Sequence, residues 1–109
     1  MADKAWKEFE RSAAALFGGK RAWANSGERL DFESPTAIGQ CKLVRVLSLA
    51  ALTELAEEME REAMPKHKFG VVCVKLRRGK GRKSPMLVVT TADMWALMNG
   101  ATSEQEPAR

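Results

Sequence analysis

The eight residues F-G-V-V-C-V-K-L (69–76) are almost all apolar, and this stretch decides the fold. Its length and its valines predict a strand that is covered on both faces. Directly before it, residues 49–63 place leucine and methionine at helical spacing among glutamates, which predicts an amphipathic helix. Ser48 is suited to cap this helix and Pro65 to end it. A long helix that leads into a buried strand indicates a crossover, so we expect the strand to have a parallel neighbour.

The rest of the chain supplies shorter elements around this unit. Residues 4–17 have apolar side chains at positions i, i+3 and i+7, which predicts another amphipathic helix. Alternating apolar residues and turn signals predict four more strands, at 20–24, 29–33, 36–43 and 86–90. A capping residue and apolar spacing predict a last helix at 92–98. This order predicts an α/β fold with a mixed central sheet flanked by helices. We expect one domain over residues 1–99 and a disordered tail over 100–109.

Composition places the chain among small globular proteins. It has 109 residues, 45% of them hydrophobic and 29% charged, which suits one domain with one core. No apolar run is long enough to span a membrane and the N-terminus lacks a signal-peptide pattern, so we expect a cytoplasmic protein. Cys41 and Cys73 each fall inside a predicted strand, so we expect two buried, reduced thiols. Two cysteines and one histidine are too few for a structural zinc site.

A polar pair interrupts the predicted strand I-G-Q-C-K-L (38–43). Gln40 and Lys42 are two residues apart, so they point to the same face of a strand. Asp31 and Glu33 share one face of the preceding strand for the same reason. An unpaired amide buried in an apolar segment costs about 2–7 kcal/mol, so this pair of polar residues calls for a structural or chemical reason.

The register of the predicted hairpin sets which of these side chains meet. If Ser34–Pro35 is the turn, Glu33 lies opposite Thr36, and Asp31 lies two positions further from the turn. Gln40 is then diagonal to Asp31 on the neighbouring strand. A carboxylate, an amide oxygen and an ammonium group would converge near the open end of the hairpin.

Two interpretations of this cluster are open. Mg²⁺ prefers oxygen ligands and keeps several waters, so Asp31, Gln40 and a backbone carbonyl near residue 41 are suited to bind it. Lys42 would then orient a water or stabilise charge that develops on phosphorus. In the alternative, Asp31 caps the turn, Gln40 lies on an exposed strand face and Lys42 extends to solvent. Composition and spacing alone favour this structural alternative.

Four short motifs together resemble those of the PD-(D/E)xK nuclease superfamily. They are W-K-E-F-E-R (6–11), Ser26–Gly27, L-D-F (30–32) and Q-C-K (40–42). Over about residues 4–98 the chain looks most similar to the archaeal-type Holliday-junction resolvases and their small phage relatives. The resemblance implies a restriction-endonuclease-like core of the order αβββαβ. It also implies a phage or prophage gene expressed in a bacterial cell.

The resemblance further implies a Mg²⁺-dependent DNA endonuclease that cuts four-way junctions as a homodimer, with Mn²⁺ able to substitute. It places the metal ligands at Glu10, Asp31 and Gln40, and Lys42 completes the catalytic set. Glu8 and Glu10 lie about 200° apart around a helix, so only one of them can face the site. The motif position favours Glu10.

Gln40 departs from the pattern of the superfamily, which usually has Glu at this place. Glutamine keeps one oxygen ligand but removes a negative charge, which predicts weaker Mg²⁺ binding. Glu33 is able to restore that charge, although a solvated turn residue is the preferred interpretation of it. Two alternative functions therefore stay open: a catalytically silent DNA-binding protein on the same fold, and a restriction-like or nonspecific DNA nuclease.

A glycine-rich basic loop, R-R-G-K-G-R-K (77–83), carries five cations in seven residues. Arginine and lysine contact phosphates with little sequence preference, so we expect this loop to bind DNA; a solvated hairpin tip is the alternative. Cations near the site strands and the serine of the Ser-Gly turn would extend the same surface. The expected DNA contacts are Lys20, Arg21, Ser26, Arg29, Arg45, Arg77, Arg78, Lys80, Arg82 and Lys83.

Overall fold

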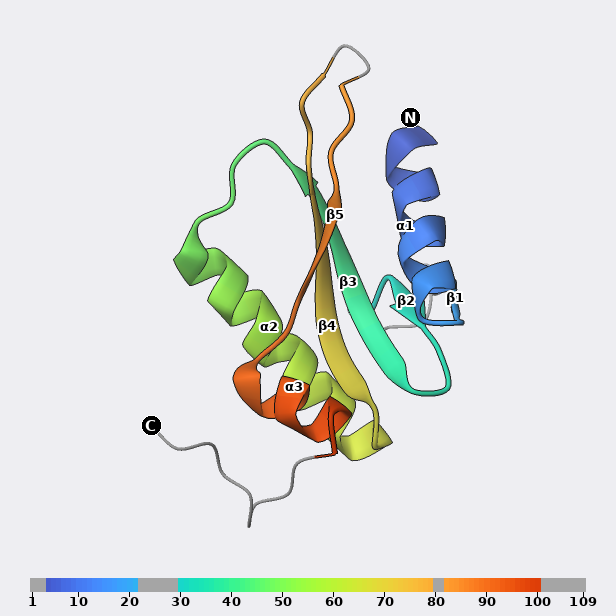
Figure 1. Cartoon of the computed structure of the whole chain (residues 1–109), viewed down its shortest axis with the longest axis vertical. Helices are drawn as coiled ribbons and strands as arrows, with labels where there is room; N and C mark the ends of the chain where they lie inside the picture. The colour runs from blue at the N-terminus through green and yellow to red at the C-terminus, as the bar shows by residue number, and fades with distance from the viewer. Residues whose placement is uncertain (1–3, 22–29, 80–81, 101–109) are drawn as a thin grey trace.

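The computed structural model describes residues 4–21, 30–79 and 82–100, which form an α/β fold around one mixed sheet (Figure 1). Five strands follow one another in the sheet in the order β1-β2-β3-β4-β5. Their bounds are β1 Lys20–Arg21, β2 Phe32–Glu33, β3 Ala37–Val44, β4 Phe69–Leu76 and β5 Met86–Val89. The β3–β4 pair is parallel and the other described pairs are antiparallel. The predicted mixed sheet and the predicted parallel neighbour of residues 69–76 are therefore confirmed.

Three α-helices pack on this sheet: α1 Lys4–Leu16, α2 Leu49–Ala63 and α3 Ala92–Met98, with a short 3-10 turn, η1 Met64–Lys66, after α2. The side chain of Ser48 accepts a hydrogen bond from the Ala51 N–H at 3.1 Å, which caps α2 as predicted. Thr91 caps α3 in the same way. None of the helices in the described ranges is long and apolar enough to cross a membrane.

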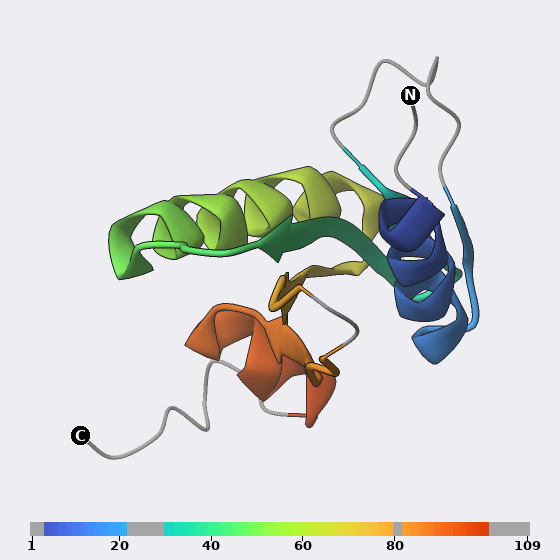
Figure 2. The same ribbon diagram turned by 90° about the horizontal axis from the view of Figure 1, so that it is seen from above.

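The two central strands separate two apolar layers. Alternate residues of β4 point to opposite faces, so Val71 and Cys73 join one layer while Val72 and Val74 join the other. The first layer lies under α1 and the second under α2, and Figure 2 shows α2 and α3 on opposite sides of the sheet. Strand β4 is thus covered on both faces, as predicted. Cys41 also belongs to the first layer, and both cysteines are buried free thiols.

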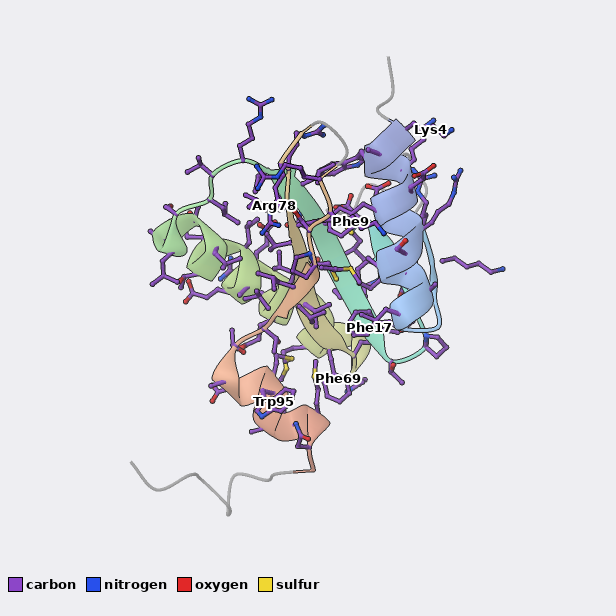
Figure 3. The ribbon with its side chains drawn as sticks, turned by 45° about the horizontal axis from the view of Figure 1, so that its top comes forward. Lys4, Phe9, Phe17, Phe69, Arg78 and Trp95 are labelled. Carbon is purple, nitrogen blue, oxygen red and sulfur yellow. The ribbon has the colours of Figure 1, made fainter. Side chains whose placement is uncertain are left out.

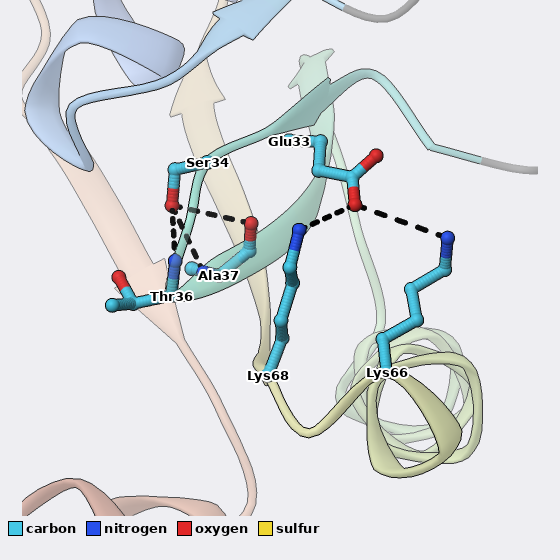
Figure 4. Close-up of polar contacts among 6 residues, drawn as sticks. All are labelled: Glu33, Ser34, Thr36, Ala37, Lys66 and Lys68. Carbon is cyan, nitrogen blue, oxygen red and sulfur yellow. Dashed lines mark hydrogen bonds and ion pairs between the residues drawn. The ribbon is translucent and has the colours of Figure 1, made fainter.

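The turn between β2 and β3 corrects the predicted hairpin. Glu33 lies opposite Ile38 and not opposite Thr36, because the turn spans more residues than Ser34–Pro35 alone. The Ser34 hydroxyl accepts hydrogen bonds from the N–H groups of Thr36 and Ala37, and the Ser34 N–H donates to the Ala37 carbonyl oxygen at 2.8 Å (Figure 4). This buried serine closes a wider loop, and the register moves by two residues.

The structure also shortens one predicted strand. Within the predicted strand 29–33, the described residues Leu30 and Asp31 are irregular, and only Phe32 and Glu33, which form β2, have strand geometry. The last residues of the predicted strand 20–24, the Ser26–Gly27 turn and residues 101–109 of the expected tail lie outside the described residues.

Gly70 at the start of β4 provides a test of this packing. A Cβ atom at this position would lie 2.2 Å from the backbone carbonyl oxygen of Met59 in α2. We expect Gly70→Ala to lower the free energy of unfolding by about 1–3 kcal/mol or more, because helix and strand must separate. Urea denaturation measures the change. Glu54→Ala, on the exposed side of α2, should stay within about 0.5 kcal/mol of the wild type; equal stability of both variants would contradict the packing.

Candidate functional site

Asp31 is positioned by an irregularity at the start of β2. Its N–H donates to the Gly39 carbonyl oxygen at 2.8 Å, while Phe32 is the register partner of the same Gly39. Two residues thus oppose one, which is the arrangement of a β-bulge. The bulge directs the Asp31 carboxylate at the neighbouring strand, where Oδ2 accepts a hydrogen bond from the Cys41 N–H at 2.7 Å. This bond fixes the carboxylate beside the backbone of the Q-C-K stretch.

Glu10 reaches the same region from α1. It is only 6% exposed, whereas Glu8 is exposed to solvent, so the expectation that Glu10 is the inward carboxylate is confirmed. Its Oε2 accepts a hydrogen bond from the indole Nε1 of Trp6 at 2.7 Å. Its Oε1 accepts from Nε and Nη2 of Arg21 at 3.0 and 2.8 Å. Glu10 is therefore held by two donors, and one of them is cationic.

Burial, hydrogen bonding and neighbouring charges shift the pKa of the Asp31 carboxyl in opposite directions. Burial is the largest influence and raises the pKa of the Asp31 carboxyl; the hydrogen bond from Cys41 works against this effect. The neighbouring carboxylate of Glu10 raises the pKa further, and the Lys42 ammonium lowers it. The structure therefore brings Asp31 into electrostatic contact with Glu10 and with Lys42.

Gln40 and Lys42 flank Cys41 on β3. Cys41 is fully buried in the layer under α1, so strand alternation places Gln40 and Lys42 on the opposite face. Both side chains are partly buried, and the amide oxygen of Gln40 is out of contact with solvent. The structural alternative required Gln40 to lie on an exposed strand face, and the structure does not show this. The hydrogen bond that Asp31 accepts from the Cys41 N–H brings this carboxylate closer to the Q-C-K stretch than the diagonal position predicted from the sequence.

Glu33 does not belong to this cluster. Its Oε2 accepts a hydrogen bond from Lys68 Nζ at 2.5 Å and lies 3.9 Å from Lys66 Nζ, so two lysines that precede β4 hold it (Figure 4). The hydrogen bond from Lys68 lowers the pKa of the Glu33 carboxyl. The Glu33 side chain is 39% exposed, which agrees with its interpretation as a solvated residue next to the turn, and it is in addition held by an ion pair. The structure gives no support to the idea that it restores the charge missing at Gln40.

The donor atoms around Asp31 are oxygens, the type of ligand that a hard cation such as Mg²⁺ prefers. No group of three or more His, Cys, Asp or Glu side chains close enough to hold a metal ion occurs in residues 4–21, 30–79 and 82–100. The available set is the Asp31 carboxylate and nearby backbone carbonyls, with the Glu10 carboxylate close to Asp31 and the buried Gln40 amide oxygen on the face of β3 opposite the α1 layer. Mg²⁺ accepts such a sparse protein set, because it keeps several waters. A cation would also relieve the repulsion between the two carboxylates.

The expected DNA contacts divide into three groups. Arg77, Arg78, Arg82 and Lys83 lie on the segment that connects β4 to β5, and Lys20 and Arg45 lie near the ends of β1 and β3. All of these side chains are exposed apart from Arg77, which is partly buried. Arg21 is paired with Glu10, and its role as a phosphate contact stays a prediction. Ser26, Arg29 and Lys80 lie outside the described residues.

The sequence did not predict the partners of the Glu10 and Glu33 carboxylates. Trp6 and Glu10 are four residues apart on α1, which is the spacing of side chains that meet on a helix, so this contact had a visible signal. The contacts of Arg21 with Glu10 and of Lys68 with Glu33 join distant segments, and no local pattern announces them.

Comparison of the chain with protein-family models, with curated proteins and with solved structures gives no match. The functional argument therefore rests on the geometry of the site.

Asp31→Asn separates the electrostatic role of this residue from its structural one. Asparagine keeps an oxygen that accepts the Cys41 N–H and removes the charge that burial and Glu10 disfavour. The raised pKa means that the folded wild type binds a proton more tightly than the unfolded chain, so it loses stability as the pH rises past the ordinary value of 3.8.

We therefore expect Asp31→Asn to have the higher free energy of unfolding at pH 7, and the difference to shrink as the pH falls into the acid range. Urea denaturation as a function of pH measures this. Asp93→Asn, an exposed carboxylate in the first turn of α3, should give no such gain at pH 7. A lower stability of Asp31→Asn at every pH would contradict the proposed balance of charges.

Proposed function

We propose that this chain is a Mg²⁺-dependent, structure-selective DNA endonuclease with a restriction-endonuclease-like core, and that it resolves four-way junctions. The observation that carries the proposal is the Asp31 carboxylate, which the Cys41 N–H holds within the electrostatic reach of both Glu10 and Lys42. This support adds to the motif resemblance, because three of the residues that the motifs single out, Glu10, Asp31 and Lys42, interact electrostatically. Mn²⁺ is expected to replace Mg²⁺, and the bacterial cytoplasm is the expected location.

Each residue of the cluster has a distinct role in this proposal. Asp31 and Gln40 supply an anionic and a neutral oxygen for the cation, and Glu10 adds negative charge from α1. The cation, when bound, supplies Lewis-acid stabilisation of the phosphate oxygens. The Lys42 ammonium orients the attacking water or stabilises the charge that develops on phosphorus. The Cys41 N–H keeps the Asp31 carboxylate in place throughout.

The proposed homodimer follows from the substrate, since symmetric cleavage of a four-way junction needs two sites related by a two-fold axis. Strand β5 lies at one end of the strand order, so one of its edges has no neighbour within the described sheet. Nearby, Leu87, Val88 and Trp95 are 56, 44 and 62% exposed, which is high for large apolar side chains. This side of the sheet is the proposed contact between the two copies.

One observation favours a second candidate, a silent DNA-binding protein on the same fold. Both carboxylate oxygens of Glu10 are engaged, by Trp6 and by Arg21, and Gln40 lacks the charge of the usual glutamate. If the Arg21 pair persists when DNA is bound, the cation would have one protein carboxylate only. A restriction-like or nonspecific nuclease is the third outcome of the same assay.

The purified protein should cut a four-way junction in the presence of Mg²⁺ and leave a linear duplex of the same sequence intact. Lys42→Ala should slow cleavage by about 100-fold or more, because a group that stabilises the transition state is lost. Junction affinity should change little. Gel electrophoresis of end-labelled DNA measures cleavage, and a mobility shift measures binding.

Lys68→Ala is the matched control for this experiment, because it removes a lysine that pairs with Glu33 and not with the cluster. This variant should cut at the wild-type rate. Tight junction binding by the wild type without any cutting would favour the silent protein, and equal cutting of both DNAs would favour the nonspecific nuclease. Absence of DNA binding would overturn the proposal as a whole.

Gln40→Glu tests the cation directly and without DNA. The added carboxylate should lower, several-fold, the Mg²⁺ concentration that gives half of the maximal rise in melting temperature, because Mg²⁺ affinity depends on ligand charge. Asp31→Asn should abolish the rise. Thermal denaturation at a series of Mg²⁺ concentrations gives both results, and equal Mg²⁺ responses in all three proteins would exclude this site.

A further inference from the structure

A concave site lies between α1 and the segment that joins β4 to β5. Its volume is about 510 Å³, which is within the range of about 300–1,000 Å³ usual for ligand sites. Its apolar part is formed by Ala5 and Phe9 from α1 and by Leu43 and Leu76 from the ends of β3 and β4. Figure 3 shows Phe9 directed from α1 toward the sheet, with Arg78 at the same end of the molecule.

The charge around this cavity is of one sign. Its lining contains several cations and no carboxylate among the described residues: Lys75, Arg77, Arg78, Arg82 and Lys83. The Arg78 guanidinium donates to the Lys83 carbonyl oxygen at 3.0 Å and so ties together the two sides of the loop. Lys75 Nζ lies 6.0 Å from the centroid of the Phe9 ring, so one cation is close to the apolar part.

We propose that this cavity takes one unpaired nucleotide of a DNA strand, with the base against the apolar part and the flanking phosphates on the cations. This inference rests on the proposed function and deepens it by naming the feature of DNA that is recognised. Contacts to the backbone of a duplex require only exposed cations. The combination of a concave apolar surface with surrounding cations is instead typical of sites for single-stranded nucleic acid.

The position of the cavity connects it with cleavage. Phe9 directly precedes Glu10 in α1, so the helix that lines the cavity also carries one carboxylate of the candidate cluster. Leu43 directly follows Lys42 in β3, and strand alternation directs these two side chains to opposite faces. A nucleotide in the cavity would therefore lie on the α1 side of the candidate catalytic cluster. A base inside a continuous duplex must leave its stack to enter, which costs a few kcal/mol, whereas a base at a branch point has less to lose. The cavity thus provides a physical basis for a preference for branched DNA.

Leu76→Ser is the test variant, because it removes apolar surface and no charge, and because Leu76 is 44% exposed and tolerates a polar residue. The probes are a labelled duplex with one extrahelical nucleotide and the same duplex fully paired, in EDTA so that cleavage does not occur. The wild type should bind the first duplex roughly tenfold more tightly, which corresponds to about 1.4 kcal/mol from packing one base against the apolar part. Leu76→Ser should lose most of this preference and keep its affinity for the paired duplex. Fluorescence anisotropy measures both.

Three control variants make the result specific. Leu49→Ser changes an exposed leucine at the start of α2, outside the cavity lining, and should keep the preference. Arg82→Ala should weaken the binding of both duplexes to a similar extent, and Arg61→Ala, on the exposed surface of α2, should weaken neither.

The inference is overturned if the wild type shows no preference, or if Leu76→Ser retains it while paired DNA still binds. Binding of thymidine monophosphate alone, without any DNA binding, would also overturn it, in favour of a free nucleotide as ligand. If the junction is bound and cut normally while Leu76→Ser has no effect, the proposed function stands and only the nucleotide site fails.

Discussion

The parallel pairing of β3 with β4 is the constraint on which the rest of the molecule depends. Two parallel strands cannot be joined by a tight turn, so the chain must cross over, and α2 is that crossover. Because β4 is apolar on both faces, and β3 is so apart from Gln40 and Lys42, each face needs a cover. The crossover helix covers one face, and α1 covers the other. With β4 on one side of β3, the other side is left to the short strand β2 and to Asp31.

The candidate site lies where regular pairing along that free side of β3 ends. After the bulge at Gly39, a side chain and not a backbone carbonyl accepts the next bond, the one from the Cys41 N–H. The bond that completes the sheet locally is thus the same bond that orients the candidate metal ligand. Part of the stability of this edge is given up for that arrangement, since burial and the Glu10 carboxylate both disfavour a charged Asp31. Carboxylates held against their own repulsion are typical of sites that receive a cation.

The parts of the fold that follow from local chemistry could be read from the sequence. The helix 49–63, the strand 69–76 and the helix 92–98 have the predicted bounds, because their periodicity is strong and Ser48 and Thr91 cap the helices. The hairpin register could not be read, because the buried Ser34 hydroxyl closes the turn through backbone groups that no sequence pattern specifies.

The candidate site divides in the same way. Helical geometry allows only one of Glu8 and Glu10 to face the site, and the motif position selected Glu10. The predicted hairpin brings Asp31 near the Q-C-K stretch both in the predicted register and in the observed one, which differs from it by two residues. The pairing of Arg21 with Glu10, and of Lys68 with Glu33, depends on how distant segments pack. These ion pairs decide which charges are available to a ligand, and for that reason the sequence alone did not predict the partners of Arg21 and Glu33.

The two thiols at the centre of the sheet have a practical consequence. Cys41 and Cys73 are register partners on the parallel strands and neither is exposed to solvent. The hydrogen bond with the Cys73 thiol and burial both raise the pKa of Cys41, so this thiol stays protonated and unreactive in the folded protein. An alkylating reagent reaches it only when β3 and β4 separate. The rate at which the native cysteines are modified therefore measures how often β3 and β4 separate. No added probe is needed for this measurement.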